Sequence, residues 1–330
     1  MIITRALYGL KSAGAAFRSF LTITLDDMNF KPSRADPDAW IRPAIKLDNE
    51  KYYEYILVYV DDILAISHNP QQIMDGIQDR FKFKGGKATV PENYLGSKLK
   101  FRQINGYGCW TISSYDYVQA AIKNIEEKLQ QTSEKLARKA PAPMASGYRP
   151  ELDLTPELNS SDTQYFQESI GIQRWVIELG RVDILTEVSM LSAYQADPPE
   201  GHLGQLLHIV VFLKHHPKLT IYLDPAIPQI NPSIFNHNID PFKENYRGAY
   251  EEIPEDIPEP LGRSVVTTAY DDASHAVNKI TRRSHTGYIL FVNKAPISHY
   301  SKRQNTIESS SFSSEFIAMR TCVEAIHLLR

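Results

Sequence analysis

The feature that most constrains this chain is a run of strand-forming residues that two adjacent carboxylates interrupt. Residues 52–66 are rich in Tyr, Ile, Val and Leu, and Asp61 and Asp62 stand within the run. Because aspartate is disfavoured inside strands, the pattern predicts two antiparallel strands joined by a tight turn at the acidic pair. Both carboxylates then lie at the tip of one hairpin, where their charges repel by about 1 kcal/mol even in water.

A divalent cation at this tip would remove the repulsion. Mg²⁺ binds carboxylate oxygens and keeps coordination sites for phosphate and water. A polar two-residue turn that binds nothing is the simpler interpretation, and the spacing alone favours it.

A second acidic cluster lies near the end of the chain. Asp271 and Asp272 follow a predicted strand, and Glu315 begins a predicted helix further along. A carboxylate at a strand end and another on a helix can converge on a metal ion. The alternative is a surface turn together with an exposed helical glutamate.

Composition excludes several classes of protein. The 330 residues are 42% hydrophobic and 23% charged, which is typical of a soluble chain with more than one domain. No apolar run approaches the roughly 20 residues of a membrane helix, and the first residues lack a signal-peptide pattern. Cys109 and Cys322 fit neither a disulfide framework nor a zinc site. We therefore expect an intracellular protein with no membrane partner.

The formal net charge of −3 is unevenly distributed. Residues 71–150 carry +6 and residues 261–330 carry +4, whereas residues 151–200 carry −8. Basic segments of this kind suit contacts with phosphate, although solvated surfaces on a nearly neutral protein explain them equally well.

Apolar periodicity predicts the remaining elements. Helices are expected over residues 16–28, 71–81, 117–140, 163–194, 203–214 and 315–329, and strands over 94–101, 109–112, 264–270 and 287–292. Residues 143–161 are expected to form a linker, and residues 251–260 an acidic, proline-containing tether. In the first of these helices, Ala16, Phe20, Ile23 and Met28 lie near one apolar face. In the last helix, Phe316, Met319 and Val323 form an apolar stripe.

Several motifs, taken in order, resemble one known family. The first part of the chain resembles the reverse transcriptase of copia-type retrotransposons in the residues, order and spacing of three motifs, Arg5–Ala13, Asp36–Trp40 and Tyr59–Asp62. Further along, Asp272–Ala276 and Ser313–Phe316 resemble the ribonuclease H domain of the same polyproteins.

The resemblance implies an α+β protein. Its parts would be a partial right-hand polymerase palm and thumb (residues 1–145), a helical connection region (146–260) and a truncated ribonuclease H-like α/β domain (261–330). The implied reaction is RNA-directed DNA synthesis with Mg²⁺ or Mn²⁺. The implied partners are an RNA or DNA primer–template, an RNA–DNA hybrid, deoxynucleoside triphosphates and other retrotransposon proteins, in a cytoplasmic particle.

The resemblance also assigns residues to roles. In the polymerase part, Asp61 would bind the metal directly with Asp62 as its helper, and Tyr59 would lie near the primer end. Gly9 and Lys11 would pack against the incoming nucleotide and the template.

In the nuclease part, Asp272 and Glu315 would be the metal carboxylates, with Asp271 as the alternative register for Asp272. The family's polymerase has a further catalytic aspartate before the Leu7–Lys11 segment, and its nuclease has one after the Glu315 helix. Neither is among these residues. We therefore expect both sites to be incomplete, and the enzyme to be weak or inactive as encoded. The alternative is a catalytically silent nucleic-acid-binding remnant of a degenerate element.

Overall fold

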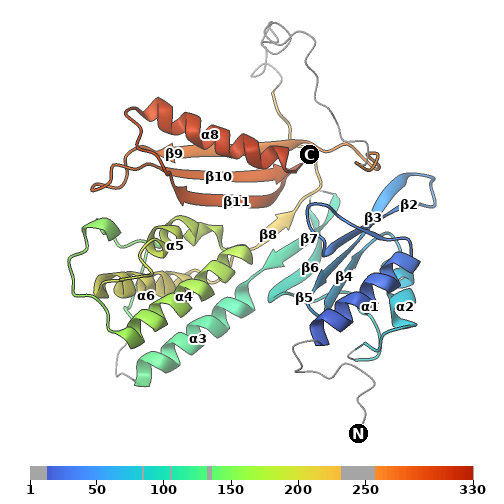
Figure 1. The fold of residues 1–330 in the computed structure, drawn as a ribbon, viewed down its shortest axis with the longest axis horizontal. Coiled ribbons are helices and arrows are strands. Elements are labelled where there is room, and N and C mark those ends of the chain that lie inside the picture. The colour runs from blue at the N-terminus through green and yellow to red at the C-terminus, as the bar shows by residue number, and fades with distance from the viewer. Residues whose placement is uncertain (1–12, 84, 105, 132–135, 232–256, 330) are drawn as a thin grey trace, which may run out of the picture. The chain divides into compact units, whose positions relative to one another are not determined.

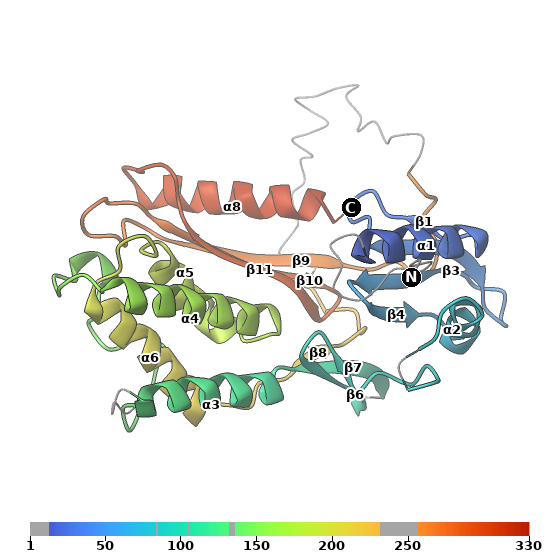
Figure 2. The ribbon, with the colours of Figure 1, turned by 60° about the horizontal axis from the view of Figure 1, so that its bottom comes forward.

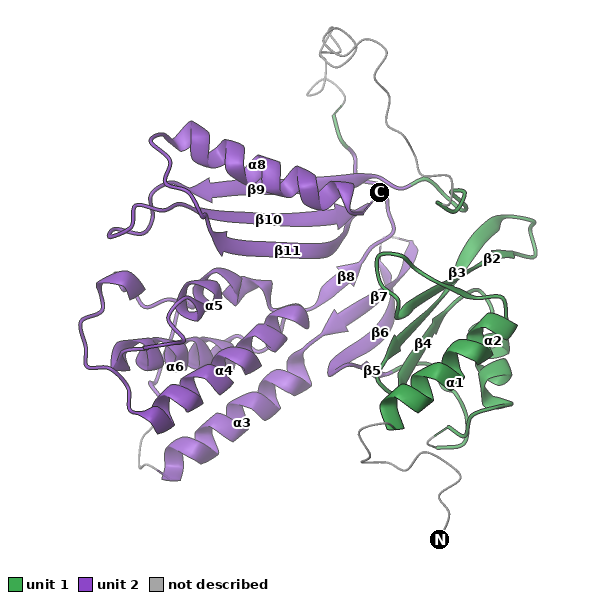
Figure 3. Ribbon diagram, viewed as in Figure 1, with its two compact units in different colours: residues 1–91, 230–264 green, residues 92–229, 265–330 purple. Residues whose placement is uncertain are grey.

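The computed structural model describes residues 13–83, 85–104, 106–131, 136–231 and 257–329. It divides into two compact units (Figure 3), of which unit 1 comprises residues 1–91 and 230–264, and unit 2 residues 92–229 and 265–330. Gly9 and Lys11 lie outside the described residues. The contacts therefore divide the chain at residue 91, whereas the boundaries at 145 and 260 stay predictions.

Unit 1 is an antiparallel sheet with two helices packed on one face (Figures 1 and 2). Its strands follow the order β1-β2-β3-β4. Its elements are α1 (Ala13–Asp27), β1 (Lys31–Pro32), β2 (Ala39–Ile45), β3 (Lys51–Tyr59), β4 (Asp62–Ile66) and α2 (Pro70–Gln78). The core consists of apolar side chains from helices and sheet: Leu21, Leu25, Phe30, Trp40, Ile56, Ile73 and Ile77.

The first helix is confirmed, but its buried face differs from the predicted one. Phe20 and Ile23 are 46% and 56% exposed, whereas Leu21 and Leu25 are buried. Both sets repeat at helical spacing, so periodicity finds the helix without deciding which apolar stripe meets the sheet.

Unit 2 contains a helical bundle and two antiparallel sheets, in the strand orders β5-β6-β7-β8 and β11-β10-β9. The helices are α3 (Tyr115–Gln131), α4 (Ser160–Glu178), α5 (Leu185–Ser192), α6 (Glu200–His215) and α8 (Ser311–His327). The strands are β5 (Asn93–Tyr94), β6 (Ser97–Ile104), β7 (Tyr107–Ser113), β8 (Ile221–Leu223), β9 (Thr267–Ser274), β10 (His285–Val292) and β11 (Ala295–Arg303). Short 3-10 helices span Pro150–Leu152 and Val182–Ile184.

Two predicted elements of unit 2 are interrupted by glycine. The helix predicted over residues 163–194 breaks after α4, where Gly180 has a φ of +110° that favours glycine. The strand predicted over residues 94–101 contains a turn at Leu95-Gly96, whose φ values of +51° and +89° are typical of a two-residue type I′ hairpin.

Other predictions for unit 2 also need correction. Residues 136–140 are not helical, so the helix predicted to reach Ala140 is shorter. Residues 143–161 do not form a free linker, because Pro150 and Glu151 are buried and the Pro150 carbonyl lies 2.9 Å from His202 Nε2. Strand β11 carries no clear apolar alternation and was not expected.

Helix α8 runs along the sheet of β9, β10 and β11 (Figure 2). Its buried residues are small: Ser314, Ala318 and Cys322. The predicted stripe of Phe316, Met319 and Val323 lies on the exposed side, at 53%, 46% and 44% exposure. The helix is apolar on two sides, and the side with small residues allows the closer approach to the sheet.

Candidate functional site

The hairpin of β3 and β4 carries the acidic pair. Tyr59 pairs with Asp62, so the two-residue turn consists of Val60 and Asp61, and Asp62 is the first residue of β4. The predicted tight turn is confirmed, one residue earlier than the acidic pair itself. Val60 has a φ of +56°, which is rare for a β-branched residue and costs on the order of 1–3 kcal/mol. The surrounding sheet therefore holds this turn in a strained conformation.

Both carboxylates at the tip are available to a ligand. Asp61 and Asp62 are exposed, and neither side chain forms a hydrogen bond or ion pair with a residue that the structure describes. Tyr59, 48% exposed, lies across the ladder from Asp62. The oxygen donors suit a hard divalent cation, and the pair offers two ligands to it.

The Asp36–Trp40 segment positions the tip from the neighbouring strand. The Asp36 side chain accepts a hydrogen bond from the Asp38 backbone N–H at 2.9 Å, which forms a local turn. The Asp38 carbonyl in turn accepts from the Val58 N–H at 2.9 Å, two residues before Val60. Arg18 holds the Asp38 carboxylate at 2.6 Å. The motif was singled out from the sequence, but these supporting roles were not.

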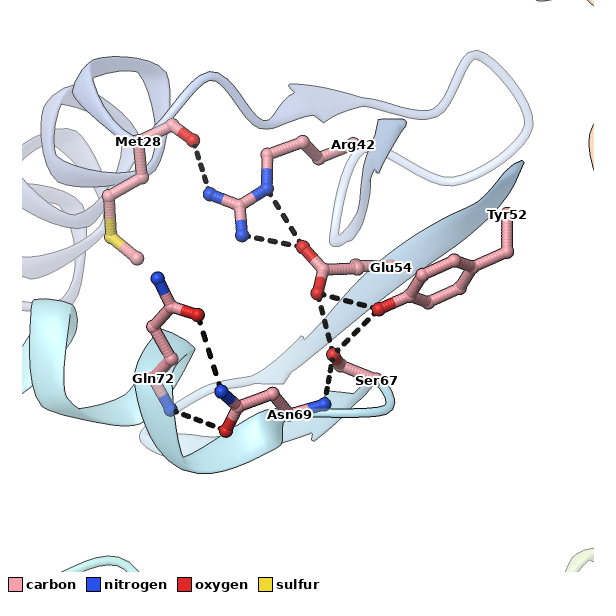
Figure 4. Close-up of polar contacts among 7 residues, drawn as sticks. All are labelled: Met28, Arg42, Tyr52, Glu54, Ser67, Asn69 and Gln72. Carbon is pink, nitrogen blue, oxygen red and sulfur yellow. Dashed lines mark hydrogen bonds and ion pairs between the residues drawn. The ribbon is translucent and has the colours of Figure 1, made fainter. Parts of the chain in front are cut away.

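A polar network fastens the opposite end of β3 (Figure 4). Arg42 donates from Nε and Nη2 to Glu54 Oε2 at 2.9 and 2.5 Å, and from Nη1 to the Met28 carbonyl at 2.8 Å. Tyr52 and Ser67 donate to Glu54 Oε1 at 3.1 and 2.6 Å. The network therefore joins β2 and β3 to the residues that directly follow α1 and β4.

The charge of Glu54 is stabilised by these contacts. Burial raises the pKa of this carboxyl group, but the hydrogen bonds from Ser67 and Arg42 and the charge of Arg42 outweigh burial, so its pKa lies below the ordinary value. Glu54 is 6% exposed. No sequence pattern distinguished Glu54 from the other charged residues of the hairpin.

The second acidic cluster converges in part. Glu315 Oε2 accepts a hydrogen bond from the Ala273 N–H at 3.0 Å. The α8 carboxylate therefore reaches β9 at the residue that directly follows Asp271 and Asp272. His275 Nδ1 lies 2.8 Å from Ser314 Oγ, and the Ser310 side chain caps α8 by accepting from the Ser313 N–H. These contacts of the Ser313–Phe316 motif hold Glu315 against the strand.

Asp271 and Asp272 point to opposite faces of β9, because side chains alternate along a strand. Asp271 shares its face with the buried Ala273, and it faces α8: burial, and then the charge of Asp271, raise the pKa of Cys322 on that helix. Asp272 lies on the other face, exposed and opposite Gly287. Of the two registers, Asp271 is the aspartate on the Glu315 side.

The acidic side chains at these two places are too few to form a complete two-metal site. Within the described ranges, no group of three or more His, Cys, Asp or Glu side chains could hold a metal ion. The β3–β4 tip supplies two carboxylates, and on β9 only Asp271 lies on the Glu315 side, whereas a full two-metal cage needs more ligands.

Known proteins match this chain over the region that carries these motifs. Residues 1–135 match the family model described as reverse transcriptase (RNA-dependent DNA polymerase). This segment is a reverse transcriptase domain. The hairpin with Asp61 and Asp62, the Asp36–Trp40 turn and the Glu54 network all lie within it.

Beyond the reverse transcriptase domain, similarity extends over nearly the whole chain. The chain is 26% identical to the Retrovirus-related Pol polyprotein from transposon RE1 of Arabidopsis thaliana over 317 residues, which are 95% of this chain and 18% of that protein. It is 25% identical to the Putative transposon Ty5-1 protein YCL074W of Saccharomyces cerevisiae over 96% of this chain and 87% of that one. The chain thus spans less than a fifth of the Arabidopsis relative. No solved structure matches it.

These similarities confirm the resemblance to retrotransposon reverse transcriptases. Among the helices that the structure describes, none is long and apolar enough to cross a membrane.

Proposed function

We propose that this chain is part of a copia-type retrotransposon polyprotein, and that its reverse transcriptase domain acts in RNA-directed DNA synthesis. The observation that carries the proposal is the β3–β4 tip, where two exposed carboxylates without partners among the described residues stand on a strained turn. Such strain is commonly found at functional sites. The domain's partners are then a primer–template and deoxynucleoside triphosphates.

Asp61 and Asp62 would hold Mg²⁺ or Mn²⁺ at this tip. A bound divalent cation would neutralise charge on the reacting phosphates and activate the primer hydroxyl. Asp61 lies within the turn and would bind the metal directly, and Asp62, the first residue of β4, would be its helper. Tyr59 would pack near the primer end, and Gly9 and Lys11 against nucleotide and template.

Primer extension on a primed RNA template tests this proposal. We expect residues 1–330 alone to extend slowly or not at all, because two carboxylates form an incomplete cage. Fusion to a segment that supplies a further aspartate should raise extension, and Asp61→Asn should abolish it. The matched control is Asp27→Asn, since Asp26 and Asp27 are also adjacent but form ion pairs with Lys31 and Arg80. Extension that survives Asp61→Asn would overturn the proposal.

We propose a ribonuclease H-like role for residues 261–330, supported by the contact of Glu315 with the Ala273 N–H. The substrate would be the RNA of an RNA–DNA hybrid, and the metal carboxylates would be Glu315 and Asp272, with Asp271 as the alternative. Hybrid cleavage by a version completed with a further aspartate should disappear on Glu315→Gln. Loss on Asp271→Asn but not on Asp272→Asn would assign the register, and cleavage indifferent to Glu315→Gln would contradict the role.

A further inference from the structure

A proline-containing segment of unit 1 lies far from most of that unit in the sequence. Residues 257–263 contain Pro258 and Pro260, and their contacts group them with residues 1–91. They include the end of the acidic tether that the sequence predicts over residues 251–260. We call residues 257–263 the strap.

The strap contacts the first residues of β3. The Tyr53 hydroxyl donates a hydrogen bond to the Glu259 carbonyl at 2.6 Å. Further along the strap, Gly262 lies beside Lys51, since a Cβ on this glycine would be 4.0 Å from the Lys51 carbonyl oxygen. Gly262 has a φ of +87°, a conformation that favours glycine, so the strap bends in a defined way at this point.

A third contact follows in the same order. Arg263 Nε lies 3.3 Å from Oε1 of Glu50, the residue directly before β3. Strap positions 259, 262 and 263 therefore meet positions 53, 51 and 50, so the strap runs antiparallel to the start of β3. One exposed ion pair alone contributes little stability. Three contacts in a consistent order indicate a docked segment.

The chemistry of both surfaces suits this pairing. Proline lacks a backbone N–H and keeps the residue before it extended, so Glu259, between Pro258 and Pro260, presents its carbonyl to an external donor. Tyr53 and Tyr55 point to the same face of β3, and their ring centroids are 6.5 Å apart. Aromatic surfaces are typical partners of proline-containing segments, because an extended segment loses little conformational entropy when it docks.

The strap ends where the chain passes into unit 2. Residue 264 is the last residue of unit 1, and residue 265 begins the final part of unit 2. Strand β3 in turn ends at the acidic turn of Val60 and Asp61. Docking of the strap therefore attaches the start of residues 265–330 to the strand that leads to the acidic turn.

We propose that the strap binds the start of β3 in cis, as a proline-containing peptide on an aromatic surface, and that this contact holds the point at which the chain leaves unit 1. Tyr53 binds the main chain of the strap through its hydroxyl, and Glu50 binds the cation at the end of the strap. The proposal adds an intramolecular docking site to unit 1, and it requires neither polymerase nor nuclease activity.

Electron paramagnetic resonance of a nitroxide at position 259 measures the docking in the full chain. Glu259→Cys keeps the carbonyl that Tyr53 contacts, and Cys109 and Cys322 are buried, so the label attaches to the new cysteine. We expect an immobilised spectrum. Tyr53→Phe should lower the ratio of docked to free label about fivefold, which is the effect of one net hydrogen bond. The matched control is Tyr55→Phe, which should leave the ratio unchanged, since the Tyr55 hydroxyl forms no hydrogen bond with a described residue.

Trypsin gives a second measurement that needs no label. Cleavage after Arg263 requires release of the strap, so its rate follows the undocked fraction. The rate should rise about fivefold in Tyr53→Phe and stay unchanged in Tyr55→Phe. Circular dichroism of each variant verifies its fold.

Three results would overturn the inference. The first is an equal docked-to-free ratio and an equal cleavage rate in the parent chain and in Tyr53→Phe. The second is an equal loss of docking in Tyr53→Phe and Tyr55→Phe. The third is a docked fraction that rises with protein concentration, which would place the strap on a second copy of the chain.

Discussion

The Glu54 network offers the sharpest test of how the acidic hairpin is held. Glu54→Gln keeps the shape of the side chain and removes its charge. The variant leaves Arg42, whose guanidinium donates to Glu54 and to the Met28 carbonyl, without its counter-charge (Figure 4). Because the amide also presents an N–H₂ group, one of the contacts from Arg42, Tyr52 or Ser67 meets a donor where it needs an acceptor.

The size of the loss follows from burial. Removing one partner of a buried ion pair costs about 3–5 kcal/mol, and a charge-assisted hydrogen bond contributes about 1.5–3 kcal/mol. The Glu54 side chain is 7% exposed, but that of Arg42 is 25% exposed, and water screens its charge. We therefore expect Glu54→Gln to lower the free energy of unfolding of unit 1 by about 2–3 kcal/mol.

Urea unfolding measures this loss through Trp40, which is buried in the same core. Trp110 and Trp175 lie in unit 2, so replacing both with Phe makes fluorescence specific for unit 1. With a typical m-value of about 1–3 kcal/mol per M, the midpoint should fall by roughly 1 M or more. The matched control is Asp27→Asn, which removes one charge from a more exposed ion pair of unit 1, with Arg80, and should leave the midpoint almost unchanged.

The pH dependence gives a second readout. Since the folded pKa of Glu54 is lowered, its contribution is present above the unfolded value of about 4.3 and is lost as the pH falls through the folded pKa. The difference between wild type and Glu54→Gln should therefore shrink below about pH 4.3. Equal midpoints for the wild type and Glu54→Gln at pH 7, or a difference that does not change with pH, would refute the reasoning.

Three further predictions concern other places in the chain. Gly201→Ala should destabilise unit 2 by about 1–3 kcal/mol in thermal unfolding, because the added Cβ meets the Asp153 carboxylate, to which Tyr148 and Thr155 donate hydrogen bonds. Gly204→Ala on the same helix has open space around its Cβ and should be neutral or stabilising. Burial, then the charge of Arg303, lowers the pKa of His285 to about 4 from 6.5, so stability should fall as the pH drops from 6.5 to 4 and His285→Gln should flatten this slope. In any version of the chain that extends a primer, Asp61→Asn should reduce the rate more than Asp62→Asn, and equal losses in a steady-state extension assay would contradict the assigned roles.

Local sequence patterns predicted much of the fold because hairpins and amphipathic helices are encoded by neighbouring residues. The acidic turn, α2 and α3 are of this kind, and Ile73 and Ile77 are buried as their spacing requires. Periodicity could not decide between two apolar stripes, so Phe20 and Phe316 were placed on the wrong face. That choice depends on packing with distant elements.

A sequence motif identified the two carboxylates of the candidate site, but no motif identified the contacts that hold the hairpin in place. Asp61 and Asp62 stand out because aspartate is disfavoured in strands, whereas Glu54 and Asp38 look like ordinary surface charges. Strand pairing brings Arg42 to Glu54, and the packing of α1 brings Arg18 to Asp38. The same limit applies to β9, where only the alternation of the folded strand separates Asp271 from Asp272. Register and tertiary partners are long-range properties, so a single sequence leaves them open.

The central claim is that the acidic turn of the reverse transcriptase domain binds a divalent cation. Electron paramagnetic resonance of Mn²⁺, titrated into the chain with primer–template and a deoxynucleoside triphosphate, tests it most directly. We predict a bound Mn²⁺ population that Asp61→Asn removes and that Asp27→Asn, in the ion-paired Asp26-Asp27 pair, retains. Unchanged Mn²⁺ binding in Asp61→Asn, or an equal loss in Asp27→Asn, would contradict the claim.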